Sequence, residues 1–77
     1  MGEKKHTELA KFVKRKRKET NLTQVELADK AGVGLKFVRD LEQNKKTLRM
    51  DKVNDVLILF GHQLGPTVMD RSQLLNE

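Results

Sequence analysis

The chain has 77 residues, no cysteine, and a net charge of +5 at neutral pH. This length fits one small domain, and the lack of cysteine excludes a disulfide framework, thiolate chemistry and zinc–thiolate sites. No apolar run is long enough to span a bilayer and the N-terminus lacks a signal-peptide core, so we expect a cytoplasmic protein.

The basic charge lies at one end of the chain. Residues 1–20 hold eight Lys and Arg against three acidic residues, whereas residues 21–77 hold eight of each. A basic segment attached to a neutral remainder is suited to binding a polyanion, such as nucleic acid or an anionic membrane. The alternative is that these charges only keep the protein in solution. We expect no membrane binding, because the apolar side of the basic segment holds just three sizeable residues.

The first helix is expected to run from Thr7, which can cap it, to about Thr20. Its apolar face consists of Leu9, Phe12 and Val13. This stripe is too narrow to hold an isolated helix, so the helix has to pack on the elements that follow.

The strongest pattern in the chain is a pair of short helices in its middle. Thr23 and Glu26 have the spacing of a capping box, which marks a helix start, and Gly32 marks the end of that helix. Apolar residues from Leu35 to Leu41 then recur at helical spacing and predict a second helix. Two short helices joined by a tight glycine turn cross steeply, so the pattern predicts a helix-turn-helix, whose second helix enters the DNA major groove.

A fourth helix is expected from Asp51, acting as its N-cap, to Phe60, with Gly61 ending it. Asn44, in the loop before it, suits a left-handed helix-ending position. The apolar residues expected to complete the core are Leu48, Val53, Val56, Leu57 and Phe60.

The central residues carry a family resemblance over about Leu9 to Gly61. They resemble the Xre-type helix-turn-helix domain of lambdoid phage repressors in the run Thr23-Gln24-x-x-Leu27-Ala28-x-x-Ala31-Gly32-Val33-x-x-x-x-Val38-x-x-Leu41-Glu42. The resemblance implies an all-α, lambda-repressor-like fold of about four helices. It also implies a structural ion pair between Arg17 and Glu42, which would tie the first helix to the third.

The resemblance further implies two sets of DNA contacts. Contacts to phosphate are expected from Thr23 and Gln24 at a helix start, and from Gln43 and Lys45 in the loop after the recognition helix. The residues expected to face the base edges are Gly34, Leu35, Lys36, Arg39 and Asp40.

Several of these assignments leave alternatives open. Lys36 and Arg39 can donate to guanine O6 and N7, and Asp40 can accept from cytosine N4. Lys36 can equally meet a phosphate, and Arg39 can pair internally with Glu42 or Asp40, in which case Asp40 orients Arg39. Plain surface positions are the alternative for Gln24, Gln43 and Lys45. For Phe37, beside the core positions, we expect peripheral packing. These residues differ from the glutamine-rich readers of the phage proteins, so no operator sequence is implied.

The C-terminal part departs from a plain phage-repressor domain. Gly65 and Pro66 disfavour a helix, and residues 62–69 permit a short strand that would need a partner, most simply the same strand of a second subunit. We therefore expect a homodimer joined through Leu64, Val68 and Met69, which resembles HipB-like antitoxins. The alternative is a tail that folds back on its own subunit or is disordered. In the single domain of residues 1–77, this places the core at about 7–61, the dimerisation strand at about 62–69 and a loose tail at 70–77.

The sequence thus predicts a DNA-binding transcriptional regulator, nucleoid-associated when bound, that represses through a palindromic double-stranded operator. The resemblance suggests the antitoxin of an autorepressed operon with a HipA-like kinase toxin as partner. The alternatives are a stand-alone phage or restriction-modification regulator, or a protein-interaction module without specific DNA binding. We expect no enzyme activity, cofactor, metal or small-molecule substrate, because the two histidines lie in unsuitable places and no nucleophile or phosphate-loop motif occurs.

Overall fold

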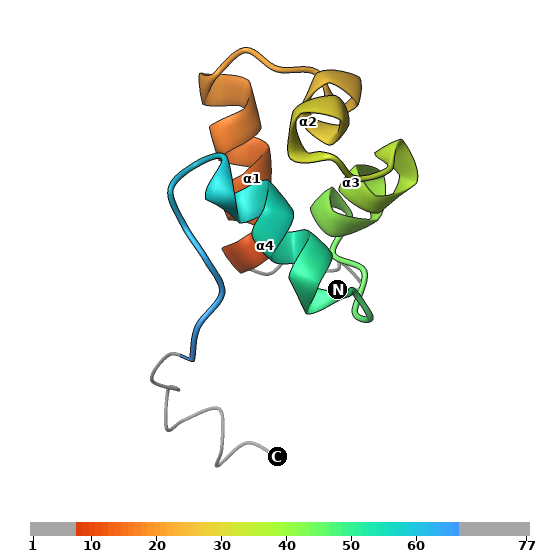
Figure 1. The fold of residues 1–77 in the computed structure, drawn as a ribbon, viewed down its shortest axis with the longest axis vertical. Coiled ribbons are helices and arrows are strands. Elements are labelled where there is room, and N and C mark those ends of the chain that lie inside the picture. Colours follow the sequence, from red (N-terminus) through yellow and green to blue (C-terminus); the bar gives the residue numbers. More distant parts are fainter. Residues whose placement is uncertain (1–7, 67–77) are drawn as a thin grey trace, which may run out of the picture.

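The computed structural model describes residues 8–66, which form four helices and, within that range, no strand. The helices are α1 (Glu8–Glu19), α2 (Gln24–Ala31), α3 (Leu35–Glu42) and α4 (Met50–Ile58), and Figure 1 shows them gathered around one centre. The expected all-α class with four helices is confirmed. Val68 and Met69, and with them most of the expected strand's apolar residues, lie outside the described residues.

Helix α1 matches the expected first helix within a residue at its C-terminal end. Glu8 in its first turn and Lys18 in its last complement the helix dipole. Val13 is fully buried, and Leu9 and Phe12 are half-buried against the core. Ala10, which was not part of the expected apolar face, is also buried.

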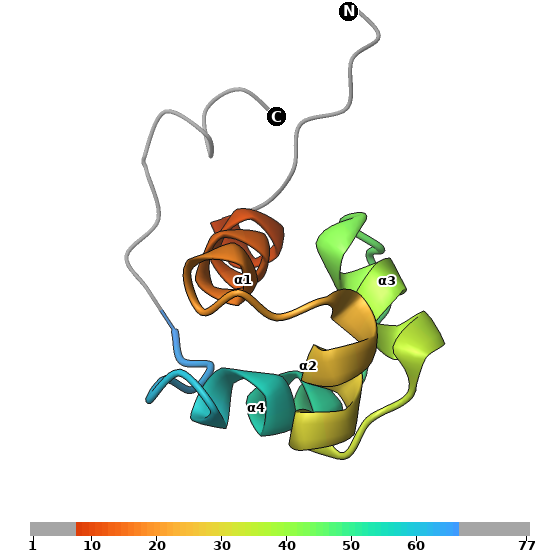
Figure 2. The same ribbon diagram turned by 90° about the horizontal axis from the view of Figure 1, so that it is seen from above.

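The start of α2 and the turn from α2 into α3 are built as the sequence predicts. The Thr23 hydroxyl accepts from the Glu26 backbone N–H at 3.1 Å, and the Glu26 carboxylate accepts from the Thr23 N–H at 2.9 Å. Gly32 then takes a left-handed conformation with φ 73°, which allows the chain to leave α2 and enter α3 at Gly34. Figure 2 shows α3 crossing α2 steeply.

The predicted cap of α4 is wrong. The helix begins at Met50 with Arg49 as its N-cap, and no side chain caps it. Asp51 lies inside the first turn, where its carboxylate accepts from the Lys52 N–H at 2.9 Å and pairs with Arg49 at 2.7 Å. An aspartate is favourable both at the N-cap and in the first turn of a helix. The residue type alone therefore did not show which of these two positions Asp51 occupies.

Helix α4 also ends earlier than Phe60. After Ile58 the chain tightens into hydrogen bonds three residues apart, from Phe60 N–H to Leu57 O at 2.9 Å and from Gly61 N–H to Ile58 O at 3.0 Å. Gly61 follows with φ 74°, so it is the residue that turns the chain out of the helix.

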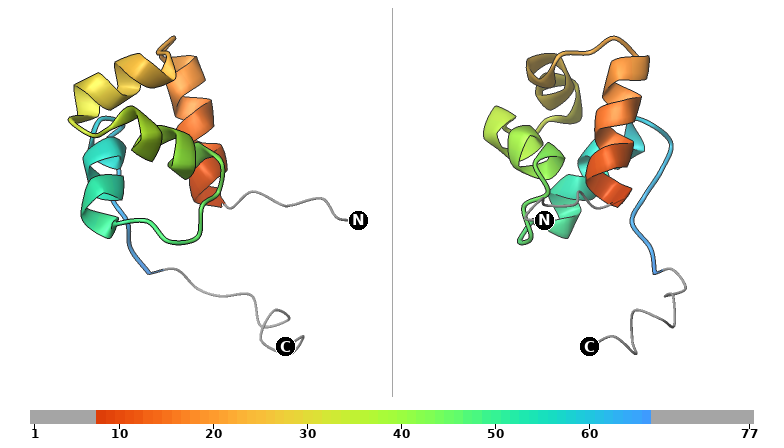
Figure 3. Two further views of the ribbon diagram at one scale, coloured as in Figure 1. Left: turned by 90° about the vertical axis from the view of Figure 1, so that its right-hand side faces the viewer. Right: turned by 180° about the vertical axis from the view of Figure 1, so that it is seen from behind.

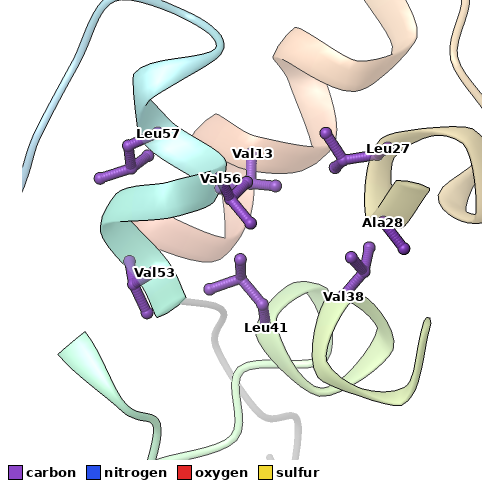
Figure 4. Packing of buried hydrophobic residues seen from close by; sticks show 8 residues of the cluster. All are labelled: Val13, Leu27, Ala28, Val38, Leu41, Val53, Val56 and Leu57. Atoms are coloured by element: carbon purple, nitrogen blue, oxygen red, sulfur yellow. The ribbon is translucent and has the colours of Figure 1, made fainter. Parts of the chain in front are cut away.

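The core lies where the four helices meet, as Figure 4 shows. Every helix contributes to the cluster of buried residues Val13, Leu27, Ala28, Val38, Leu41, Val53, Val56 and Leu57. Phe37, Leu48 and Phe60 pack at its edge. Because α3 places Val38 and Leu41 in this cluster, its opposite face is held toward the outside.

A short C-terminal segment, residues 62–66, runs from the end of α4 back along α1 (Figure 3). The His62 ring lies on Phe12 with 4.6 Å between ring centroids, and the Leu64 N–H donates to Asn54 Oδ1 at 2.8 Å. Leu64 itself is half-buried against the core. This segment is therefore attached to its own subunit up to at least Leu64.

Candidate nucleic-acid interface

Helix α3 has a buried and an exposed side. Its inner side is buried through Val38, Leu41 and Glu42, whereas Lys36 and Arg39 are exposed. It packs against both α2 and α1, so a surface that docked on its outer side would meet a helix supported from behind.

Arg17 and Glu42 are joined by two side-chain hydrogen bonds. Arg17 Nε lies 2.6 Å from Glu42 Oε2, and Nη2 lies 3.0 Å from Oε1. The third nitrogen, Nη1, donates to the Leu22 carbonyl at 2.9 Å. The hydrogen bond to Glu42 raises the pKa of Arg17 above its ordinary value, and the charge of Glu42 adds to the effect while burial opposes it. Only 12% of the Arg17 side chain and 3% of the Glu42 side chain are exposed, so the end of α3 is anchored to α1 by a buried pair.

Gln24 joins the same cluster from a third helix. It is the first residue of α2, and its side-chain amide donates to Glu42 Oε1 at 3.1 Å. The carboxylate of Glu42 thus receives hydrogen bonds from both α1 and α2. The amide group of Gln24 keeps a second N–H, and the first backbone N–H groups of α2 point out of the helix start beside it.

Asp40 is held between two lysines. Lys36 Nζ lies 3.1 Å from Asp40 Oδ2, one helical turn away, and Lys45 Nζ lies 3.5 Å from the same oxygen. The hydrogen bond from Lys36 is the main cause that lowers the pKa of Asp40 below its ordinary 3.8, and the Lys45 charge acts in the same direction. Asp40 is therefore an ionised acceptor at neutral pH. The Lys36–Asp40 spacing of four residues is a helical pair that sequence alone could have suggested.

Arg39 makes no side-chain hydrogen bond or ion pair within residues 8–66, although the sequence allowed pairing with Asp40 or Glu42. Asp40 contacts Lys36 and Lys45 instead, and Glu42 contacts Arg17 and Gln24. The guanidinium group of Arg39 is exposed on the outer side of α3 and available for an external partner.

The remaining predicted contact residues lie at the two ends of α3 and at the start of α2. Gly34 is the exposed N-cap of α3, Leu35 is half-buried at its start, and Gln43 is its exposed C-cap. Thr23 takes part in the capping box of α2. The start of α2 lies next to Glu42, because the side chain of Gln24 is hydrogen-bonded to it. The structure thus brings the predicted phosphate and base contacts to one region.

Residues 8–66 contain no group of three His, Cys, Asp or Glu side chains placed to hold a metal ion. None of the helices in that range is long and apolar enough to cross a membrane.

A sequence model of the helix-turn-helix family matches residues 13–61, which include α2, α3, α4 and most of α1. This match covers more than half of the chain, so the protein belongs to that family, and the Xre-like resemblance is confirmed.

Among curated proteins, the uncharacterized HTH-type transcriptional regulator y4mF of Sinorhizobium fredii is 56% identical over 45 residues. The alignment covers 58% of this chain and 59% of that relative, so the chain spans less than two-thirds of the relative's length. Both findings favour a DNA-binding regulator over an enzyme.

Proposed function

We propose that the protein is a sequence-specific DNA-binding transcriptional regulator, acting as a repressor. The observation that carries this proposal is an externally exposed helix α3 with Lys36 and Arg39 on its outer side, in a chain that belongs to the helix-turn-helix family. The anchoring of α3 by Arg17 and Glu42 supports it, because base readout requires a helix whose orientation is fixed before binding.

In this function, the two predicted sets of contacts have separate tasks. Thr23, Gln24, Gln43 and Lys45 meet phosphates and set the position of the domain on the duplex. Gly34, Leu35, Lys36, Arg39 and Asp40 face base edges and supply sequence preference. Repression then follows from occlusion, because a protein bound over a promoter excludes polymerase.

We further propose that the protein binds as a homodimer to an inverted repeat with half-sites about 34 Å apart. Dimerisation is assigned to residues 62–69 through Leu64, Val68 and Met69. The exposed apolar side chain of Met50, at 71% exposure on α4, lines a hollow together with Leu64 and supports an association surface there. Sedimentation equilibrium is expected to give twice the 8.9 kDa chain mass.

The partner suggested by the resemblance to HipB-like antitoxins is a HipA-like kinase toxin encoded beside this protein, with the pair repressing its own operon. A kinase-like reading frame next to the gene and co-purification of its product are the expected observations. If neither is found, a stand-alone phage or restriction-modification regulator is the better assignment.

Hydroxyl-radical footprinting on the DNA upstream of the protein's own gene tests the function directly. We expect two protected patches on one face of the duplex, about one helical turn apart. Uniform protection along the whole fragment, or none, would instead favour a protein-interaction module that uses this fold without specific DNA binding.

A further inference from the structure

We propose that Lys36 and Asp40 act as one unit and read a single G·C base pair in each half-site, with Lys36 on guanine and Asp40 on the paired cytosine. The inference rests on the proposed DNA-binding function and deepens it by naming one element of the target.

The first ground is the geometry of the two side chains. A donor, Lys36 Nζ, and an acceptor, Asp40 Oδ2, lie side by side at 3.1 Å on the outer side of α3. The Lys36 side chain is 83% exposed and the Asp40 side chain 23%, so both can be approached from outside. Lys45 Nζ lies 3.5 Å from the same carboxylate oxygen and restrains it further.

The second ground is the pattern that a G·C pair presents in the major groove. Guanine O6 and cytosine N4 are hydrogen-bonded to each other, so these two atoms lie about 2.9 Å apart. That spacing matches the separation of the lysine nitrogen and the carboxylate oxygen. Guanine N7 adds a second acceptor on the side that Lys36 would face.

The same comparison disfavours the other base pairs. A T·A pair also offers an acceptor beside a donor, thymine O4 and adenine N6, but it places the thymine methyl where guanine has N7. It also places the adenine N7 acceptor beside N6, where it would face the Asp40 carboxylate. Reversed pairs exchange donor and acceptor altogether.

The third ground is charge. A lone carboxylate facing DNA would be repelled by the phosphates. The lysines on either side of Asp40 offset its charge, so this acceptor can enter the groove. Arg39 is not part of the unit, since Asp40 does not contact it.

Binding-site selection from a random-sequence duplex library tests the proposal, using the full chain, Lys36→Ala and Asp40→Ala. For the wild type we expect an inverted repeat with one strong G·C preference per half-site. Each variant should weaken that same preference on the order of ten-fold and leave the other positions unchanged. The double variant should lose little more than either single one. Lys46→Ala, an exposed lysine with no contact to Asp40, is the matched control and should retain every preference.

Asp40→Asn provides a second arm that changes few atoms. Asparagine can pair with adenine N6 and N7, so this variant should shift the same position toward T·A. Circular dichroism and thermal unfolding confirm that each variant is folded before selection.

The proposal is overturned if Lys36→Ala and Asp40→Ala relax different positions, or if neither relaxes any, while the wild type still selects a defined sequence. A wild type that selects no common sequence instead refutes the DNA-binding function itself, and this inference with it.

Discussion

Arg17 and Glu42 lie 25 positions apart in the sequence, yet their side chains meet through two hydrogen bonds of 2.6 Å and 3.0 Å. Glu42 also receives the Gln24 amide at 3.1 Å, so one buried carboxylate links α1, α2 and α3. The C-terminal end of the proposed recognition helix is thereby fixed to both neighbouring helices.

Replacing Arg17 by alanine should be strongly destabilising, because among residues 8–66 it leaves the buried Glu42 carboxylate with Gln24 as its only side-chain partner. We expect a loss of about 3 kcal/mol in the free energy of unfolding, measured by urea denaturation. Arg15→Ala is the matched control, since its contact with Glu19 is 3.8 Å long and well exposed, and should cost under about 1 kcal/mol. Equal losses in the two variants would show that the buried pair contributes no more to stability than the exposed pair does.

Gln24 has both a structural contact and a proposed phosphate contact, and Gln24→Ala separates them. The lost hydrogen bond to Glu42 should lower stability by about 1 kcal/mol. The lost phosphate contact should weaken binding to specific and scrambled DNA by similar factors. A change in sequence preference, seen in competition binding of the two duplexes, would contradict a phosphate role.

Gly32 is required for its backbone conformation and not for space. Its φ is 73°, and a Cβ added there would meet no atom within 4 Å. Gly32→Ala should therefore cost about 1 kcal/mol through backbone strain alone. Gly32→Asn should cost less, because asparagine tolerates the left-handed region. Thermal unfolding of both variants checks this order, and a costlier asparagine would point to a steric cause.

Asn54 holds the C-terminal segment through its hydrogen bond to the Leu64 N–H at 2.8 Å. Asn54→Ala should lower stability by about 1 kcal/mol and speed hydrogen exchange at the Leu64 amide. The Gly61 amide, bonded to Ile58 in the preceding turn, serves as the internal reference. If the Leu64 amide exchanges equally fast in both proteins, the segment is held by its other contacts, such as the packing of Leu64 and of the His62 ring.

Most of the correct predictions of the fold rest on sequence signals that act within a few residues. The capping box at Thr23 and the glycine at position 32 act within a few residues, so their spacing is sufficient to place α2. The left-handed conformation of Asn44, with φ 67°, is of the same kind. The predicted bounds of α4 differ from the observed ones at both ends. Asp51 suits both the N-cap and the first turn, and the apolar spacing does not reveal that the chain after Ile58 changes to hydrogen bonds three residues apart.

The contacts between side chains at the candidate interface were harder to predict from the sequence. Lys36 and Asp40 are one helical turn apart, so their pairing follows from spacing once the helix is known. The contacts of Lys45 with Asp40 and of Gln24 with Glu42 depend on how a loop and two helices meet in space. For the same reason, the sequence left open whether Arg39 pairs internally.

Fluorescence anisotropy against the protein's own upstream DNA and a scrambled duplex, across a salt series, tests the proposed role of α3 most directly. The wild type should prefer the upstream DNA at physiological salt, and Lys36→Ala and Arg39→Ala should each weaken that preference by about ten-fold or more. If all three proteins instead bind both duplexes alike and weaken together as salt rises, α3 does not read sequence, and DNA regulation by this helix is refuted.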